Sequence, residues 1–239
     1  MRLRRAPIES LTVDGLTFAI RWSARRATVG ITVTRDGDLR VAAPRGTSPA
    51  RLKKAVRTKL RWVRRKLTQF AEMDPPAEPT RLVPGERLPY LGRTYRLTLA
   101  DAKGQPVRLT HGRFEMSRDL DGAAREAVLD WYARRARLRI GQRVAHFAPL
   151  LEATPSAVVV RDLGRRRWGV CHTGTRVVSF HWELVFQPMR IIDYVVVHEL
   201  AHLLEPNHGS AFWRHVEELL PDCKSRRRWL SVHGQRQIF

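Results

Sequence analysis

The residues with the clearest chemistry lie in the segment HELAHLLEPNH, which spans residues 198–208. His198 and His202 are four residues apart, so on a helix they share one face and can both reach a single zinc ion. Zinc lowers the pKa of a bound water to about 7. Glu199 stands beside the histidine pair, where a carboxylate can accept the proton of that water as general base. This spacing predicts a zinc-dependent hydrolase with Glu199 as its catalytic residue.

A catalytic zinc takes three protein ligands and keeps one position open. Pro206 ends the predicted helix, and the turn that follows can bring His208 back toward the other two histidines. We therefore predict one zinc ion per chain, held by His198, His202 and His208. The alternative is a pair of hydrogen-bonded core histidines that bind no metal.

The predicted active-site helix begins at Pro188 and is apolar nearly all round, which is typical of a buried helix. Burying two histidines and a glutamate without partners costs several kcal/mol, and a metal ion would remove that conflict. A second amphipathic helix is expected after Gly209. Its apolar positions are Phe212, Trp213, Val216, Leu219 and Leu220.

Several other polar residues near the motif are ambiguous. The arginines at 165–167 either form an anion clamp at the cleft or belong to a basic turn, with Trp168 in the core. Asp193 either supports a buried network or forms a structural pair, and Cys171 is expected to be a buried thiol. No role is assigned to His172 or His181.

The elements that precede the motif begin with strands over residues 8–43, with hairpin turns at Asp14-Gly15 and Asp36-Gly37. A helix then begins at Ser48-Pro49, with Ser48 as its N-cap. Its apolar stripe consists of Leu52, Val56, Leu60, Val63, Leu67 and Phe70. Its other faces are basic, so they are either a solvated surface or a surface that faces phosphates.

Five prolines between residues 75 and 89 indicate a linker. A short strand near 95–99 is expected to pair with one at 107–109. A long helix over 121–148, with Asp121 as a candidate N-cap, a strand at 157–161 and one or two strands after residue 168 complete the pattern. No internal repeat is evident. We therefore expect a β-rich segment with a basic helix (1–75), a linker with a short β segment (76–118) and a metallohydrolase domain (119–239).

The net charge of +21, from 44 Lys and Arg against 23 Asp and Glu, favours a polyanionic partner such as nucleic acid. The first 70 residues hold 18 of the basic and four of the acidic side chains, so the N-terminal part either binds nucleic acid or is a solvated basic surface. Two cysteines, no apolar run of membrane-spanning length and no signal peptide favour a reduced, cytoplasmic protein that does not contact membranes.

The motif region DYVVVHELAHLLEPNHGSAFWRHV, with RRWGVC upstream and PDC downstream, resembles the YgjP-like metal-dependent hydrolases. These are zincins related to SprT-like and Wss1-type proteases. The resemblance is strong over the C-terminal third, and the order of elements extends it over most of the chain. It implies an α+β fold in which a zincin-like C-terminal domain sets its HExxH helix beside a small sheet. It also implies zinc ligation by the three histidines and acid–base catalysis by Glu199.

The chain departs from that family at Val170, where a serine is usual. Metzincins carry a glycine three residues after the second histidine, and Glu205 stands there instead.

Three functions remain open from the sequence. The leading one is a zinc metallopeptidase that acts on proteins or peptides, and its relatives suggest that these could be proteins bound to DNA. The second is a metal-dependent nucleotide phosphohydrolase, which the arginines would suit but which often needs a carboxylate-rich Mg²⁺ site. The third is a non-enzymatic nucleic-acid-binding protein with a structural metal, although such sites usually contain four ligands and several cysteines.

Overall fold

The computed structural model describes residues 9–34, 37–72, 80–101, 104–120, 122–164 and 167–234. The chain divides into two compact units, Met1–Met73 and Asp74–Phe239, called here the N-terminal and C-terminal units. Each has its own hydrophobic core. The predicted three-part division into 1–75, 76–118 and 119–239 stays a prediction.

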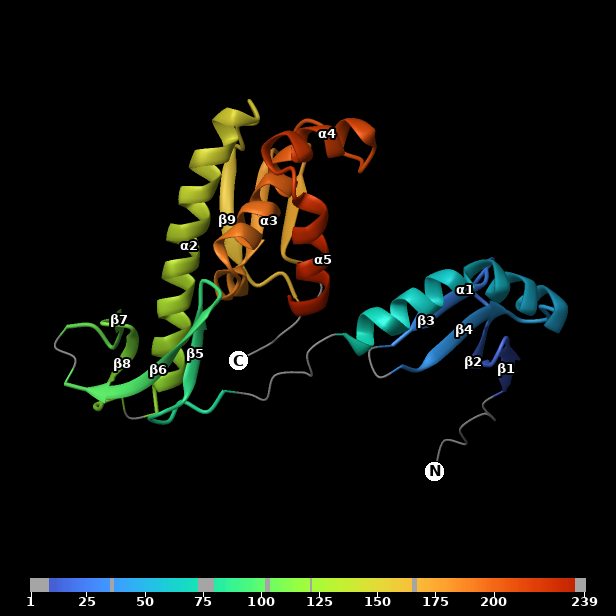
Figure 1. Ribbon diagram of the computed structural model, residues 1–239, viewed down its shortest axis with the longest axis horizontal. Coiled ribbons are helices and arrows are strands. Elements are labelled where there is room, and N and C mark those ends of the chain that lie inside the picture. Colours follow the sequence, from blue (N-terminus) through green and yellow to red (C-terminus); the bar gives the residue numbers. More distant parts are fainter. Residues whose placement is uncertain are drawn as a thin grey trace. The chain divides into compact units, whose positions relative to one another are not determined.

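The N-terminal unit is a four-stranded sheet followed by one helix (Figure 1). The strands are β1 (Ser10–Val13), β2 (Leu16–Ser23), β3 (Gly30–Val33) and β4 (Leu39–Pro44), in the order β1-β2-β4-β3. Asp14 and Gly15 form the β1–β2 turn with positive φ angles of 49° and 82°, as the hairpin prediction requires. Asp36, expected in the second turn, lies outside the described residues.

Helix α1 (Pro49–Ala71) begins where the sequence predicts, with the Ser48 side chain accepting a hydrogen bond from the backbone N–H of Arg51. Leu52, Val56, Leu60 and Val63 of its apolar stripe are buried in the core of the N-terminal unit, and Leu67 packs against that core. The charged side chains therefore face solvent.

The C-terminal unit begins with a second four-stranded sheet and a second long helix. The strands are β5 (Arg87–Tyr90), β6 (Arg93–Ala100), β7 (Val107–Thr110) and β8 (Arg113–Ser117), in the order β5-β6-β8-β7, and the helix is α2 (Ala124–Leu150). The expected direct pairing of 95–99 with 107–109 is wrong, because β8 lies between those strands, parallel to β6 and antiparallel to β7. Three consecutive residues of β8 are buried, which suits a central strand.

The two sheets share one topology. In each, the first two strands form a hairpin, the second and fourth strands are parallel, the third and fourth are antiparallel, and a long helix follows. We call β1–β4 with α1 the first module and β5–β8 with α2 the second module. The sequence itself shows no internal repeat, because a shared strand order leaves little trace in side-chain identity.

Helix α2 begins at Ala124, without a side-chain cap, and the predicted cap Asp121 lies outside the described residues. Strand β9 (Ala157–Arg161) occupies the predicted range. It joins β10 (Gly169–His172) and β11 (Val177–His181) in a three-stranded sheet of order β10-β11-β9. A 3-10 turn at Trp182–Phe186 leads into α3 (Met189–Ala201), which α4 (Ser210–Leu219) and α5 (Cys223–His233) follow.

Helix α3 lies inside the C-terminal unit, against α2, α4, α5 and β10 (Figure 1). The fold is α+β, as predicted, with the HExxH helix beside a small sheet. None of the described helices is both long and apolar enough to cross a membrane.

Candidate metal centre

Helix α3 fixes the first part of the site because most of it is buried. Its N-cap is Pro188, and nine of its 13 residues are buried. The helix ends at Ala201, earlier than the predicted stop at Pro206, and His202 is its C-cap. A helix held this firmly presents His198, Glu199 and His202 in fixed directions.

The chain after α3 turns back and returns the third histidine to the first two. The backbone N–H of Glu205 bonds the carbonyl of Ala201, and that of Gly209 bonds the carbonyl of Asn207. The expectation from the sequence that His208 comes back to the motif histidines agrees with this geometry.

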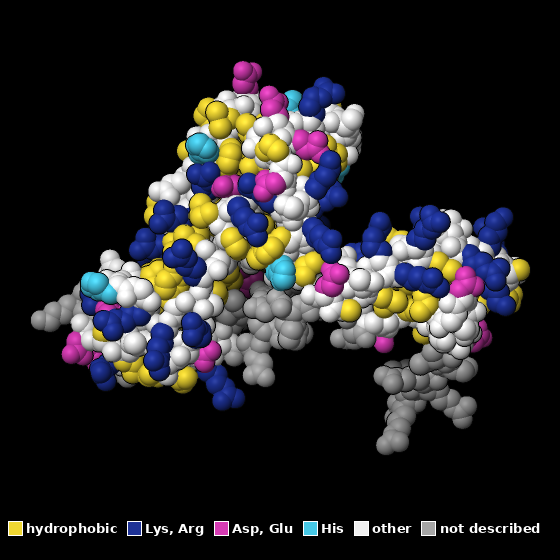
Figure 2. Space-filling model, in the orientation of Figure 1, with side chains coloured by type: hydrophobic (Ala, Val, Ile, Leu, Met, Phe, Trp, Pro, Cys, Tyr) yellow, Lys and Arg dark blue, Asp and Glu magenta, His cyan; other side chains and the backbone are white. Residues whose placement is uncertain are grey.

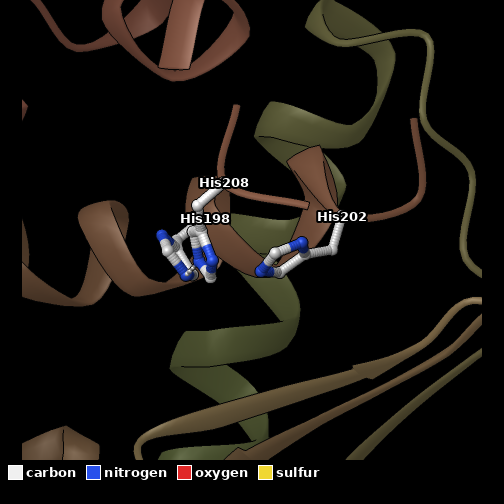
Figure 3. Close-up of side chains that lie close together, drawn as sticks. All are labelled: His198, His202 and His208. Atoms are coloured by element: carbon white, nitrogen blue, oxygen red, sulfur yellow. Dashed lines mark hydrogen bonds between the residues drawn. The ribbon is translucent and has the colours of Figure 1, made fainter. Parts of the chain in front are cut away.

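The three imidazole rings converge (Figure 3). One nitrogen from each of His198, His202 and His208 lies within 4.8 Å of the other two. The Nε2 atoms of His198 and His208 are 3.0 Å apart. A tetrahedral zinc with nitrogen ligands at about 2.0–2.1 Å sets those nitrogens roughly 3.3 Å from each other, so the His198–His208 pair is close to the spacing of such a site.

The donor chemistry of the cluster also fits a metal. Burial, followed by the neighbouring His202 and His208, lowers the pKa of His198 to about 3, so its ring is neutral and keeps a lone pair at neutral pH. Nδ1 of His202 lies 3.2 Å from the carbonyl oxygen of Glu205. Donation of that N–H to the carbonyl leaves Nε2 of His202 free to ligate, as is usual for metal-bound histidines.

Helix α4 closes one side of the cluster with aromatic rings. Phe212 contacts all three histidines, with ring centroids 4.5–5.0 Å apart, and Trp213 stacks on His208 at 5.8 Å. Phe212 and Val216 are buried, so the predicted amphipathic helix exists and its apolar side lies over the histidines. This packing restricts ring rotation of the candidate ligands.

Glu199 lies next to the histidines and is 6% exposed. Burial raises the pKa of its carboxyl to about 8, and a hydrogen bond from the backbone of Cys171 opposes that shift. A cation at the histidines would act in the same direction as Cys171 and stabilise the carboxylate.

Gly169 of β10 makes room for Glu199, a role that the motif itself does not indicate. A methyl group at Gly169 would lie 2.6 Å from Oε1 of Glu199, well inside van der Waals contact. The available signal in the sequence is a glycine inside an expected strand, which often marks a close approach of another group.

An open cavity of about 330 Å³ adjoins His198 and Glu199. Trp168 and Tyr194 contribute aromatic surface to its wall, and Arg167 and Arg227 contribute positive charge. Arg227 of α5, which the sequence reasoning also missed, stacks its guanidinium 4.9 Å from the ring of Trp213. Nothing in the spacing of the motif points to a residue 19 positions beyond His208.

Of the three arginines at 165–167 that were considered as an anion clamp, one is described by the structure. Arg167 is exposed and lines the cavity, whereas Arg165 and Arg166 lie outside the described residues. Trp168, expected in the core, is half-buried and both packs on the core and lines the cavity.

The remaining ambiguous residues lie outside the histidine cluster. Asp193 pairs with Arg143 of α2 at 2.5 Å, which is the structural alternative. His181 is buried, 3.1 Å from Asp162, and accepts a hydrogen bond from the backbone of Glu183. His172 is exposed, and Cys171 is a half-buried thiol.

Comparison with known proteins gives one matching family and a similar solved structure. The family described as YgjP-like, metallopeptidase domain, matches residues 27–233. No curated protein sequence matches the chain. Among solved structures, the chain is similar to the metallopeptidase zymogen abylysin of Pyrococcus abyssi. The two are 23% identical, with a TM-score of 0.37, over 42% of this chain and 99% of abylysin.

Proposed function

The chain belongs to the YgjP-like family of metallopeptidase domains, and on that premise we propose that it is a zinc-dependent peptidase. Zinc is held by His198, His202 and His208, and Glu199 is the general base. When bound, the zinc supplies Lewis acidity, which polarises a scissile carbonyl and lowers the pKa of the attacking water.

The observation that carries this proposal is the convergence of three imidazoles beside one buried carboxyl group. The ligand nitrogens lie within 4.8 Å of one another, and Glu199 follows His198 directly on the same buried helix. Three nitrogen ligands with an adjoining open cavity suit a catalytic zinc, which keeps one coordination position for water or substrate. A structural site would more often complete four ligands with cysteines.

The role of Glu199 follows from its position at the cavity wall. Its carboxylate accepts the proton of the attacking water and then delivers it to the departing amine. Its low exposure and its close contact with Gly169 leave the side chain little freedom to rotate away from the reacting atoms.

The position of β10 supports a peptide as the substrate. In its sheet β10 is an edge strand that pairs with β11, and Gly169 at its start touches Glu199. A substrate main chain can hydrogen-bond along such an edge as an added strand, which would place a peptide carbonyl beside the metal site. A nucleotide has no comparable way to pair with a strand edge.

Among the described residues, moreover, the histidine cluster is the single group with metal-ligand spacing, and it contains no Mg²⁺-type carboxylate.

The test is cleavage of a mixed peptide library, read by mass spectrometry, with wild type and Glu199→Gln compared at matched zinc content. We expect the variant to bind zinc and to lose at least about 100-fold in cleavage rate, because a general base contributes roughly 10²–10⁴-fold.

Parallel reactions with nucleoside triphosphates and Mg²⁺ provide the competing arm. Triphosphate turnover that Glu199→Gln abolishes, without peptide cleavage, would overturn the peptidase proposal. Equal peptide cleavage by wild type and variant would show that Glu199 is not the base.

A further inference from the structure

Helix α1 carries a dense positive charge that the proposed role of the metal centre does not explain. Its 23 residues include nine Lys and Arg and no Asp or Glu. The N-terminal unit as a whole has 18 basic and five acidic residues, a net charge of +13 in 73 positions, whereas the remaining 166 positions have 26 and 18, a net charge of +8. The charge is therefore concentrated in the smaller unit.

The cations of α1 cover the exposed side of the helix along a length of roughly 35 Å. Lys54, Arg61 and Arg65 are exposed, follow one another at intervals of seven and four residues, and lie opposite the buried apolar stripe. Figure 2 shows Lys and Arg side chains along α1, with few acidic side chains between them.

This arrangement works against the stability of the helix. Like charges three or four residues apart, such as Arg57 with Arg61 and Arg61 with Arg65, each destabilise a helix by about 0.2–0.5 kcal/mol. Arg57 has an acidic neighbour in Asp14, but the atoms are 3.8 Å apart and both side chains are about half exposed or more, so the pair offsets little. A polyanion laid along the helix would neutralise this repulsion.

Two features of the N-terminal unit distinguish between polyanions. A helix that lies on a membrane inserts an apolar face, and the apolar face of α1 is already buried against its own sheet. Single-stranded nucleic acid is usually held by exposed aromatic rings on which bases stack. Phe18 is fully buried, and Trp22, Trp62 and Phe70 are half-buried, so the described aromatic residues of this unit offer no open stacking platform.

We propose that the exposed face of α1 binds double-stranded nucleic acid through its phosphate backbone. Lys and Arg side chains neutralise phosphates and release the condensed counterions, and that release provides the binding free energy. This activity goes beyond the proposed peptidase function and does not depend on it, because the metal centre lies wholly in the other unit.

The experiment measures binding of the full-length chain to fluorescent 24-base-pair DNA, 24-base-pair RNA, single-stranded DNA of the same length, and vesicles rich in phosphatidylserine, over a series of salt concentrations. The test variant is Lys54→Gln/Arg61→Gln/Arg65→Gln. The matched control is Arg93→Gln/Arg125→Gln/Arg137→Gln, which removes the same charge from exposed positions of the C-terminal unit. Circular dichroism checks that both variants fold.

We expect duplex binding to weaken steeply as salt is added. In a plot of log binding constant against log salt concentration, each phosphate contact should contribute about −0.9 to the slope. The α1 variant should bind the duplex on the order of 100-fold more weakly at 0.1 M salt, and the magnitude of its salt slope should be smaller by about 2.7. The control should stay near wild type in both quantities. Binding to duplex DNA and binding to duplex RNA both fit the proposal. The relative affinity of the two duplexes shows which kind of nucleic acid the helix prefers.

Four results would overturn the proposal. These are no duplex binding at low salt, equal losses in the two variants, tighter binding to single strands than to duplexes, and vesicle binding that matches duplex binding and is lost in the α1 variant.

Discussion

The first and second modules share a strand order and a following helix, but their helices have different surroundings. Helix α1 buries four residues along one stripe and presents nine cations with no acidic residue. Helix α2 buries eight residues, packs on α3 and β9, and carries six arginines with two acidic residues. One supersecondary arrangement therefore forms a cationic unit in the first module and supports the helix of the histidine cluster in the second.

The corresponding hairpin turns show the same contrast. A methyl group placed on Gly15 in the first module would meet no atom within 4 Å, whereas a methyl group on Gly92 would lie 2.7 Å from Cγ of Pro188. The backbone N–H groups of Leu91 and Gly92 bond the carbonyls of Val185 and Phe186, just before α3. The second module therefore holds the start of α3, and changes to it should reach the histidine cluster.

The largest effect is expected at the contact between β10 and α3. Gly169→Ala forces the side chain of Glu199 out of its position, so we predict a loss of peptide cleavage of about 100-fold or more, comparable to loss of the general base. Zinc content should stay near wild type, because the histidines are not touched. Gly174→Ala is the matched control, since no atom lies within 4 Å of that position. Full activity of Gly169→Ala would refute the positioning role.

Core truncations in the two long helices should separate the two units. Leu52→Ala in α1 and Ile140→Ala in α2 each remove a fully buried side chain and should cost about 2–5 kcal/mol. We expect Leu52→Ala to weaken duplex binding and leave peptide cleavage intact, and Ile140→Ala to lower both cleavage and zinc retention. Calorimetry with activity assays at several temperatures measures both. A loss of cleavage in Leu52→Ala as large as in Ile140→Ala would show that the units are energetically coupled.

The two turn glycines allow a smaller, closely matched comparison. Alanine at Gly15 or at Gly92 must adopt a positive φ, of 82° or 77°, which costs on the order of 1 kcal/mol in either place. Gly92→Ala also meets Pro188, so its free energy of unfolding should fall by a further 1–3 kcal/mol, about the cost of overpacking. Chemical denaturation of both variants gives the difference. Equal losses would mean that Pro188 can move away without cost.

The smallest effects are expected from two ion pairs. Arg143 and Asp193 join α2 to α3 at 2.5 Å and are 25% and 17% exposed. We predict a loss of about 1–3 kcal/mol for Arg143→Gln, which leaves a partly buried carboxylate without its partner. Arg57 and Asp14 in the first module are 64% and 46% exposed, so Arg57→Gln should change stability by less than about 0.5 kcal/mol. A double-mutant cycle on each pair tests the ranking.

The convergence of the three histidines could be predicted from the sequence because its geometry is local. An i, i+4 histidine pair is fixed by the helix itself, and six residues suffice to return His208 to it. The apolar stripe and N-cap of α1 are local for the same reason. The strand expected at 157–161 is also present, over a run of three valines that favours extended backbone.

The rest of the site depends on contacts between distant segments. Gly169 meets Glu199, and Arg227 reaches the cavity, only because β10 and α5 pack against α3. Strand β8 was missed because it follows the His111-Gly112 turn, which lacks the Asn-Gly or Asp-Gly signal of a two-residue hairpin. Side-chain periodicity does not encode the order of strands in a sheet, so it could not predict that β8 lies between β6 and β7.

Metal content tests the central claim most directly. Elemental analysis of the purified chain and of His202→Ala, both after exposure to zinc and removal of the excess, reports whether the three histidines form a metal site. We predict about one zinc per wild-type chain and a loss of that zinc in the variant. A wild-type protein that takes up no zinc, or a His202→Ala variant that retains the full amount, would contradict the assignment of His198, His202 and His208 as the metal centre.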